Sequence, residues 1–526
     1  METFTSEERD ALAPYFTNLD GPVFALVNLP EVVKGALFAR YSRSAKSLRR
    51  LFLDEFLERS PGGATAPAVG TARAERLYER VFSEFGDDSV AQLGGVHVAC
   101  EGASNILTKV LEWGRLMAYL EQSTRYIPYT DRPDGRWKYH VPAELDGHPL
   151  RPRYVETLDR AFETYARWIE PMREHWAARV PQPAGEGEAA WRATVRAKAL
   201  DGLRGLLPAA TRSSVGIFGT GQGYEALLLR MRTHALAEVR DYAESMLVEL
   251  RKVIPAFLTR LDRPDRGGAW SRYLEAARQE TAEVAARLLS GLEPEPRGEV
   301  TLTDFDPDGE IKVVAAALYA SSRLPDDQLL AVARKLGPEE RRRVLEAYVG
   351  RRANRRHKPG RAFERTAYRF DVLGDYGAFR DLQRHRLLTL EWQPLSTRHG
   401  WVGSDEIEAV GALADWRRVM DDAGELYEAL VAASLPHVAP YSVSMAYRVR
   451  FYMELNAREA MHMIELRTTP QGHPAYRRIC QAMHRLIALE AGHLAIAAAM
   501  SFADFSDADD GRLDSERATE RRRQTS

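Results

Sequence analysis

The sequence predicts a mainly helical protein with few strands, built from two related halves. Apolar residues recur about every 3.6 positions along most of the 526 residues, which is typical of helices that bury one face. The proline spacing in Glu293-Pro-Glu-Pro-Arg-Gly298 is typical of an extended linker, and we place the main domain boundary there. We therefore expect one unit over residues 1–292, a second over residues 293–503, and a disordered polar tail over residues 504–526.

Composition argues against several classes of protein. The formal net charge is -2, whereas a general nucleic-acid binder carries a basic surplus. The two cysteines, Cys100 and Cys480, are too few for a disulfide framework and lack metal-ligand spacing. No stretch reaches the ~18 uncharged apolar residues of a membrane helix, and residues 1–20 do not resemble a signal peptide. We expect a soluble, cytoplasmic protein that holds no metal and binds neither nucleic acid nor membrane.

Helices account for most of the elements expected in the first half. The helical pattern pauses at residues 60–67 and at the glycines between positions 216 and 223. The expected helical regions cover residues 20–60, 72–119, 154–178, 189–206, 224–261 and 270–290.

The second half adds two candidate strands. Residues 300–305 fit a short strand, and Tyr368, Phe370 and Val372 alternate with other residues as a second strand would require. The expected helices cover residues 313–336, 338–348, 375–390, 404–433, 452–467 and 475–503.

The two halves repeat one order of short motifs, which indicates an internal duplication. Each half has an apolar segment that reaches an Arg, then a Ser-Thr-Arg turn, a Leu-Pro and finally a Leu-Arg. In the first half these motifs end at Arg115, Arg125, Pro208 and Arg230, and in the second half they end at Arg386, Arg398, Pro436 and Arg467.

The triplet Arg384-His385-Arg386 is the most distinctive polar stretch. It falls in a predicted helix, where neighbouring residues point about 100° apart, so the three side chains cannot all share one solvated face. Arg offers a planar charged fork for phosphate, and His can donate to or accept from a ligand. A nucleotide-type ligand would use all three, whereas the alternative is a basic helix end that complements the helix dipole.

This triplet, with Ser396 and Arg398 downstream, resembles the Arg-His-Arg and Ser-x-Arg-Tyr pattern of flavin-dependent thymidylate synthases. The segment from Asn456-Ala-Arg458 through Leu466-Arg467 is similar to the family's Asn-Ala-Arg helix with its Leu-Arg. In the first half, residues 101–126 and Arg204-Gly-Leu-Leu-Pro208 resemble further family segments. The similarity covers most of both halves, as two fused family-like (ThyX-like) units.

The residues of the Asn-Ala-Arg segment are compatible with this resemblance. Arg458 and His462 would share one face of the expected helix, and Asn456 and Arg467 another. Two polar faces suit a helix between two ligand sites. The alternative is an amphipathic helix with a solvated face and a buried histidine.

The resemblance implies an α+β fold, mainly helical, and a homotetramer with active sites shared between subunits. It implies reductive methylation of deoxyuridylate (dUMP) to thymidylate (dTMP), with bound FAD and with methylenetetrahydrofolate and NADPH as cosubstrates. It also implies that Arg467 is a catalytic residue that orients the uracil. The implied FAD contacts are Glu364, Arg384, His385, Arg386, Asn456, Arg458 and His462. The implied substrate contacts are Glu121, Ser123, Arg125, Arg204 and Arg230.

The two halves depart from the family pattern in complementary ways. In the first half, Trp113-Gly114-Arg115 and Gly219-Thr220-Gly221 replace the flavin-side Arg-His-Arg and Asn-Ala-Arg. In the second half, on the phosphate side, His399 replaces the Tyr of the turn and Ala432 replaces the Arg of Arg-x-x-Leu-Pro. We therefore hypothesise one composite site per chain, in a homodimer that mimics the tetramer. The alternative is that both copies have drifted, so that the site binds flavin weakly or serves another pyrimidine nucleotide.

The cysteines also bear on the chemistry. A classical thymidylate synthase needs an activated cysteine nucleophile, and neither Cys100 in its apolar run nor Cys480 in a predicted helix has that context. A flavin route needs no cysteine. An alternative from another class is a non-catalytic helical scaffold or nucleotide-binding regulator that has lost turnover. The basic connector 351–358 could offer such a protein a site for an acidic partner.

Overall fold

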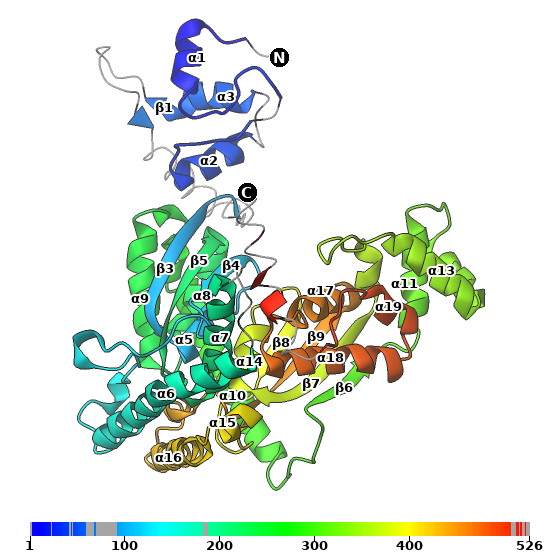
Figure 1. Cartoon of the computed structure of the whole chain (residues 1–526). Coiled ribbons are helices and arrows are strands. Elements are labelled where there is room, and N and C mark those ends of the chain that lie inside the picture. The colour runs from blue at the N-terminus through cyan, green and yellow to red at the C-terminus, as the bar shows by residue number, and fades with distance from the viewer. Residues whose placement is uncertain are drawn as a thin grey trace. The chain divides into compact units, whose positions relative to one another are not determined.

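The computed structural model describes residues 3–22, 24–41, 44, 46–58, 68–69, 92–180, 182, 188–506, 512–514, 516–517 and 521 (Figure 1). The chain forms two compact units. The first comprises residues 1–103, 114–121 and 214–292, and the second comprises residues 104–113, 122–213 and 293–526. Among the described helices, none combines the length and apolar character needed to cross a bilayer.

The compact units do not coincide with the two halves that carry the motif repeat. The chain does pass from one unit to the other between Leu292 and Glu293, where the linker was expected. However, residues 104–113 and 122–213 of the first half belong to the second unit, so residues 1–292 do not form one compact body. These first-half segments pack against second-half helices and form hydrogen bonds with second-half segments, as described below.

A three-stranded sheet forms the centre of the first unit. Its strands β3 (Gly95–Ser104), β5 (Arg212–Thr220) and β4 (Met117–Glu121) lie in the order β3-β5-β4. Strands β4 and β5 are antiparallel and place Met117 opposite Gly219. A Cβ atom at Gly219 would lie 2.4 Å from Met117 Cε, the end of a flexible side chain, so Met117 packs over the bare backbone of Gly219.

These strands correct two helical expectations in the first half. The glycines around Gly219 lie in β5, which pairs with β4, and in the first turn of helix α8 (Gly221–Arg232). Part of the region 72–119 forms β3 and β4 instead of helix, and residues 70–91 lie outside the described residues. The remaining elements of the first unit are α1 (Ser6–Leu12), α2 (Glu31–Tyr41), α3 (Leu48–Leu51), η1 (Phe52–Phe56), β1 (Leu57–Glu58), β2 (Ala68–Val69), α9 (Ala237–Arg251), η6 (Pro255–Asp262) and α10 (Gly267–Leu288).

A four-stranded antiparallel sheet forms the core of the second unit. Its order is β6-β7-β9-β8, with β6 (Val300–Phe305), β7 (Ala367–Asp375), β9 (Arg448–Asn456) and β8 (Thr389–Trp392). Every second residue of β7, such as Tyr368, Phe370 and Val372, is fully buried. Helix α18 (Pro474–Leu489) packs on β6 and β7. The two strands predicted in this half are therefore confirmed.

Two helices predicted in the second half are wrong at their ends. Residues 452–456 belong to β9, whose alternate residues Phe451, Met453 and Leu455 are buried, a period-two pattern that a helix cannot satisfy. Helix α17 (Ala457–Arg467) begins only after Asn456. The helix expected over 375–390 is limited to α14 (Tyr376–Leu382), and the triplet 384–386 lies in the turn between α14 and β8.

Buried contacts hold this turn in place. The side chain of Gln383, which follows α14, donates from Nε2 to the Lys109 carbonyl at 2.8 Å. Lys109 lies on α5 (Asn105–Leu111), and Tyr376 at the start of α14 donates its hydroxyl proton to the Asn105 carbonyl at 2.9 Å. Helices α5 and α14 occupy the same place in the two motif orders, so the two copies meet here within the second unit.

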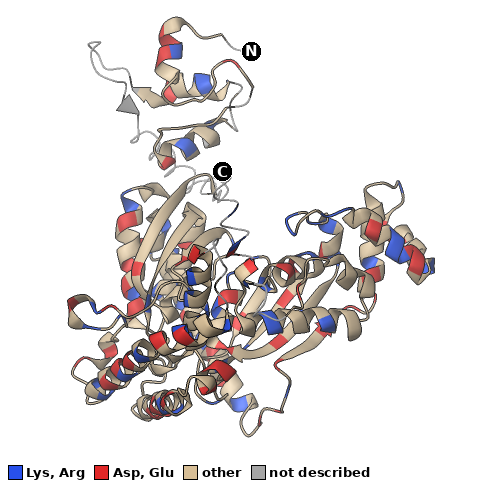
Figure 2. Cartoon of the chain, in the orientation of Figure 1, with Lys and Arg blue, Asp and Glu red and all other residues tan. Residues whose placement is uncertain are grey.

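Further pairing between the two copies stabilises the second unit. The Ala209 N–H donates to the Val443 carbonyl at 2.8 Å, and the Met445 N–H donates to the Leu207 carbonyl at 2.9 Å. These bonds join the segment after residues 204–206 of the first half to the segment after residues 439–442 of the second half. Helix α6 (Arg151–Arg179) packs along α16 (Leu413–Ala432), where Lys and Arg intermix with Asp and Glu (Figure 2). One such pair is Arg160 Nη1 and Asp422 Oδ2, 2.6 Å apart.

The remaining elements of the second unit are η3 (Pro133–Gly135), η4 (Ala143–Leu145), α7 (Glu188–Leu203), η5 (Arg204–Leu206), α11 (Gly309–Tyr319), α12 (Asp326–Lys335), α13 (Pro338–Val349), η7 (Arg361–Arg365), α15 (Asp405–Ala409), η8 (Ala439–Ser442) and α19 (Leu494–Ala499). Of the tail expected to be disordered, residues 504–506, 512–514, 516–517 and 521 are described, and Arg512 is buried. The other tail residues lie outside the described residues.

The two halves repeat one topology. In the first half the order is β3, α5, β4, a helix pair, β5 and α8, and in the second half it is β7, α14, β8, a helix pair, β9 and α17. The sheet orders β3-β5-β4 and β7-β9-β8 also correspond, and β6 is an addition at one edge. The motif repeat in the sequence therefore has a counterpart in the fold, and the α+β, mainly helical class is confirmed.

Candidate functional site

A buried hydrogen-bond chain joins the turn after α14 to helix α17. Glu459 Oε1 lies 3.0 Å from His385 Nδ1. On the other side of the ring, Arg467 donates from Nε to His385 Nε2 at 3.0 Å. The second carboxylate oxygen, Glu459 Oε2, lies 3.2 Å from His462 Nδ1. Four side chains thus form one chain, which we call the Glu459 relay.

The donors in this relay decide the protonation state of His385. A guanidinium has no acceptor, so His385 Nε2 must accept from Arg467, and Nδ1 must carry the ring proton. Burial and the nearby Arg467 lower the pKa of His385 to about 4, against the opposing effect of Glu459. Burial raises the pKa of Glu459, but the hydrogen bonds from the two imidazoles lower it more, to about 2. At neutral pH a neutral His385 therefore donates to an ionised Glu459.

The same residues are the group that could hold a metal ion in the described part of the chain. One ligand atom each from His385, Glu459 and His462 lies within 4.8 Å of the others. However, His385 Nδ1 carries a proton in the arrangement above, and the Arg467 guanidinium on the other ring nitrogen would repel a cation. The geometry favours a hydrogen-bond relay over a metal site.

Asn456 fixes the start of the helix that carries the relay. It is the N-cap of α17, and its Oδ1 accepts from the Glu459 N–H at 2.9 Å. Asn456 therefore precedes the helix, whereas the sequence placed it inside, because it also closes strand β9. This cap positions Glu459 in the first turn, from which its side chain reaches back to His385.

Half-buried cations lie at the outer edge of the relay. The side chains of Arg384 and Arg458 are 31% and 32% exposed, and Arg386 is exposed. Arg458 Nη1 lies 3.7 Å from Glu364 Oε1, so two residues expected to hold FAD are close together. Partial burial, together with the nearby Arg458, lowers the pKa of Lys358. This local surplus of positive charge suits an anionic ligand.

Arg125 brings the first half into the same unit. It is 8% exposed and donates from Nε and Nη2 to the two carboxylate oxygens of Asp201, both at 2.7 Å. Its Nη1 donates to the Tyr476 hydroxyl at 2.6 Å. The Cζ atoms of Arg125 and Arg467 both lie 5.5 Å from the centre of the Tyr476 ring. Tyr476 therefore connects a first-half arginine to the last residue of the relay.

Arg204 makes a second connection between the two copies. Its Nη1 donates to Asp381 Oδ2 at 3.1 Å, and Arg384 Nη2 lies 3.7 Å from Asp381 Oδ1. Burial alone would raise the pKa of Asp381, but the surrounding guanidiniums, first Arg204 and then Arg384, hold it well below its usual range. Asp381 is thus ionised and shared between an arginine of each copy.

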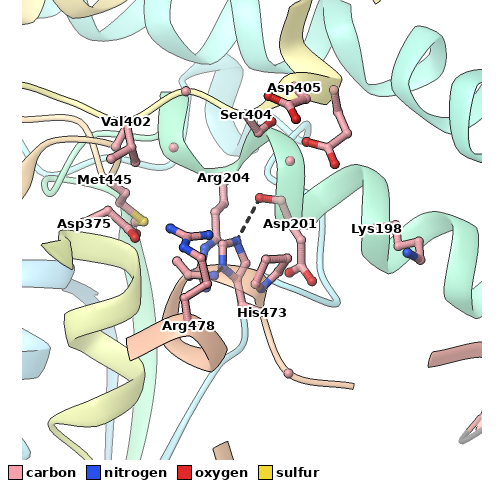
Figure 3. Close-up of a pocket in the computed structure, with 18 of the residues that line it drawn as sticks. Lys198, Asp201, Arg204, Asp375, Val402, Ser404, Asp405, Met445, His473 and Arg478 are labelled. Carbon is pink, nitrogen blue, oxygen red and sulfur yellow. Dashed lines mark hydrogen bonds between the residues drawn. The ribbon is translucent and has the colours of Figure 1, made fainter. Parts of the chain in front are cut away.

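A cavity of about 370 Å³ opens beside Arg204. Its lining comes from α7, η5, the 402–406 segment, α18 and Arg512. Figure 3 shows Arg204, Arg478 and His473 on one side of this cavity and Ser404 with Asp405 on the other. Burial lowers the pKa of His473 to about 3, and its Nε2 lies 3.3 Å from the Asp201 carbonyl. A neutral His473 and several arginines therefore form one wall.

The other predicted substrate residues do not all join this group. Ser123 is half-buried, and its Oγ accepts from the Arg125 N–H at 3.2 Å, so it shapes the turn. Glu121 is the last residue of β4 and is buried in the first unit. Arg230 lies on α8 of the first unit, where its carbonyl accepts from Thr233 Oγ1 at 3.1 Å.

Several residues of the site were not singled out from the sequence. Glu459 had a local signal, because an acidic residue three positions after an N-cap Asn is a capping pattern. Asp381, three positions before Arg384, had a weaker signal of the same kind. Asp201, Tyr476 and Arg512 meet Arg125 or one another across long sequence separations, and no local pattern marks them.

The fold and the site define a duplicated α+β protein whose clustered arginines suit an anionic ligand. A family model described as "Thymidylate synthase complementing protein" matches residues 36–256 and 301–491, one segment in each half. The chain belongs to this family, which is the flavin-dependent thymidylate synthase (ThyX) family that the Arg-His-Arg pattern resembles. The two matched segments agree with a tandem duplication.

Individual relatives differ in how much of the chain they match. A "UPF0159 protein" of Chlamydia muridarum (strain MoPn / Nigg) is 38% identical over 520 residues, which is 98% of each chain. A "Flavin-dependent thymidylate synthase" of Clostridium tetani (strain Massachusetts / E88) is 25% identical over 181 residues, 34% of this chain and 67% of that protein. A solved UMP/dUMP methylase PolB from Streptomyces cacaoi is 19% identical, with a TM-score of 0.30, over 39% of this chain and 97% of that one.

Proposed function

We propose that the protein is a flavin-dependent thymidylate synthase that methylates dUMP to dTMP at one composite site per chain. The observation that carries this proposal is the meeting of complementary motif halves in one unit. Arg125 and Arg204 of the first copy lie against Tyr476 and Asp381, which also neighbour Arg467 and Arg384 of the second copy. The second copy has Ala432 where the first has Arg204, and the first copy has Trp113-Gly114 where the second has Arg384-His385.

The substrate side consists of Arg204 and Arg467. Arg204 has a charged fork beside the cavity, and a guanidinium of this kind binds the phosphate of a nucleotide bidentately. Arg467 is held at Nε by His385, which leaves its terminal nitrogens to orient the uracil ring. Ser123, Arg125, Glu121 and Arg230 are the further substrate residues expected from the family pattern.

The residues at the outer edge of the relay fit FAD. A dinucleotide carries a pyrophosphate, and the half-buried Arg384 and Arg458, with the exposed Arg386 and Lys358, form a cationic edge that suits two phosphates. His462 and Asn456 add further hydrogen-bonding groups, and Glu364 lies 3.7 Å from Arg458. When bound, the flavin would supply the hydride chemistry, with NADPH as reductant and methylenetetrahydrofolate as carbon donor. The protein would supply position and charge.

The cysteines support a route without a protein nucleophile. Burial raises the pKa of Cys100 to about 11 and that of Cys480 to about 12. A thiol of this kind is not a thiolate at neutral pH and cannot attack a pyrimidine ring. We further propose that the protein works in the cytoplasm as a homodimer, because a duplicated chain needs two copies where a single-unit family member needs four.

A second candidate function rests on Arg125. All three of its terminal donor groups already have partners, namely Asp201, Tyr476 and the Gln471 carbonyl. In the family pattern this arginine holds the nucleotide phosphate. The alternative is therefore a nucleotide-binding protein that has lost catalysis or that methylates a different pyrimidine nucleotide.

Two measurements separate these functions. The purified protein is incubated with FAD and desalted. It should then keep the visible absorbance band of a bound flavin. Incubation with dUMP, methylenetetrahydrofolate and NADPH should then give dTMP above the level of a protein-free control. Tight dUMP binding without dTMP would favour the second candidate, and a protein that retains neither FAD nor nucleotide would refute both.

A further inference from the structure

The cavity beside Arg204 contains an arginine from the C-terminal segment that the family pattern does not predict. Arg512 is 3% exposed, lines the cavity, and donates from Nη1 to Asp201 Oδ2 at 2.8 Å. Asp201 is the residue that also receives Arg125. The end of the chain therefore returns to the same group of charges that joins the two copies.

Two arginines that line this cavity have buried hydrogen-bond donors without a partner among the described residues. Within the described part of the chain, Arg512 Nε and Nη2 and Arg204 Nη2 are buried and have no hydrogen-bond partner. Arg204 itself is 3% exposed, so water does not freely replace a partner. Buried charged donors without acceptors are unfavourable, and both side chains line the same cavity. Arg204 and Arg512 thus bring three donors without partners to the lining of one cavity.

The charges near these donors favour an anion over a neutral molecule. Asp201, which pairs with Arg512, is shared by two guanidiniums, and Arg478 adds a third cation to the wall. Asp375 also lines the wall, and burial raises the pKa of its carboxyl group. The acids Asp405 and Glu406 lie at the start of α15, and Figure 3 shows Asp405 across the cavity from Arg204. A tetrahedral oxyanion has enough acceptors for all three donors.

We propose that Arg512 is a ligand-binding residue that, with Arg204, holds the phosphate group of a nucleotide monophosphate in this cavity. The C-terminal segment thereby replaces a phosphate contact that Arg125 cannot make while Asp201 and Tyr476 engage it. The nucleotide identity rests on the proposed function, whereas the phosphate contact rests on the donors alone. The ligand is a phosphomonoester, and its sugar and base extend away from the Arg204 wall.

The test compares phosphorylated and unphosphorylated ligands in the full-length protein. Calorimetric titration with dUMP, deoxyuridine and inorganic phosphate is carried out on the wild type and on Arg512→Gln. We expect Arg512→Gln to weaken dUMP and inorganic phosphate by at least about tenfold, since one charge-assisted contact is worth roughly that factor, and to leave deoxyuridine unchanged. Arg512→Lys keeps the charge and loses the planar fork. Its affinity for dUMP and inorganic phosphate should lie between those of the wild type and Arg512→Gln.

Arg517→Gln is the matched control. Arg517 lies on the same C-terminal segment, but its Nη1 pairs with Asp514 at 3.4 Å and its side chain is 29% exposed. It should bind all three ligands as the wild type does. Circular dichroism and the unfolding midpoint of each variant show whether a loss of binding reflects a loss of folding.

The outcomes are distinct from those that test catalysis. Equal dUMP affinity in wild type and Arg512→Gln would overturn the proposal, and tighter binding in the variant would show that Arg512 blocks the cavity instead. A wild type that binds neither phosphate nor dUMP would also overturn it. Phosphate binding that depends on Arg512, in a protein that makes no dTMP, would support the site while refuting the proposed reaction.

Discussion

Replacing Glu459 by Gln removes one negative charge from the relay and leaves its shape almost unchanged. The carboxylate makes two hydrogen bonds, at 3.0 Å to His385 and 3.2 Å to His462. A hydrogen bond to a charged group contributes about 1.5–3 kcal/mol, and one between neutral groups about 0.5–1.5 kcal/mol. Two bonds that each lose about 1 kcal/mol predict that Glu459→Gln lowers the free energy of unfolding by about 2 kcal/mol at pH 7.

The pH dependence of stability should change in a defined direction. The folded-state pKa of Glu459, about 2, is lower than its ordinary value of 4.5, so its stabilisation is present above pH 4.5 and is lost as pH falls toward 2. His385, with a folded-state pKa of about 4 against 6.5, adds a loss of stability from pH 6.5 down to 4, because the unfolded chain binds the proton first. Glu459→Gln removes the first contribution and keeps the second.

Urea unfolding at several pH values measures both effects, and the ¹⁵N chemical shifts of His385 report its tautomer. Glu454→Gln is the control, since Glu454 is an acid on β9 whose side chain is 45% exposed and pairs with Arg369 at 3.1 Å. A surface pair of this kind contributes at most about 1 kcal/mol. The reasoning is refuted if Glu459→Gln unfolds like the control, or if wild-type His385 carries its proton on Nε2.

Three further changes test other parts of the site. Arg384→Ala should raise the dissociation constant for FAD at least about tenfold, because one charged contact is lost. If the wild type binds FAD and the variant binds it equally well, the triplet is not part of the flavin site. Tyr476→Phe leaves a buried guanidinium nitrogen of Arg125 without its acceptor and should lower the free energy of unfolding by about 1–3 kcal/mol in urea, with wild-type-like stability counting against the contact. Cys100 and Cys480 should react with a thiol reagent at pH 8 only after unfolding, because burial raises both pKa values; rapid labelling of the native protein would contradict their burial.

Local sequence patterns predicted the elements whose burial follows a simple period. The strand Val300–Phe305 and the long helix α6 agree with expectation. The expectation fails where two rules of sequence interpretation give different answers for the same residues. Glycines usually interrupt structure, yet Gly219 lies in β5, where it pairs with Met117 of β4. Such a contact depends on the neighbouring strand, which periodicity alone does not reveal.

The residues of the site also divide into those that a local sequence pattern marks and those that it does not. The motifs identified Arg125, Arg204, Arg384, His385 and Arg467, since each belongs to a short pattern shared with a family. Their acceptors escaped notice, because a single Asp or Tyr in a helix has many possible roles. Asp201 lies 76 positions from Arg125 and Tyr476 lies 351 positions away, so only the folded chain shows that the arginine is already engaged.

The pairing of Leu207–Ala209 with Val443–Met445 has a consequence for how the sequence can evolve. In an assembly of identical subunits, each substitution appears at every symmetry-related position at once, so no subunit can specialise. A gene that encodes both partners removes this constraint. One copy can keep Arg204 where the other has Ala432, and the other can keep Arg384-His385 where the first has Trp113-Gly114. Fusion thus allows the two halves of what was a symmetric interface to mutate independently.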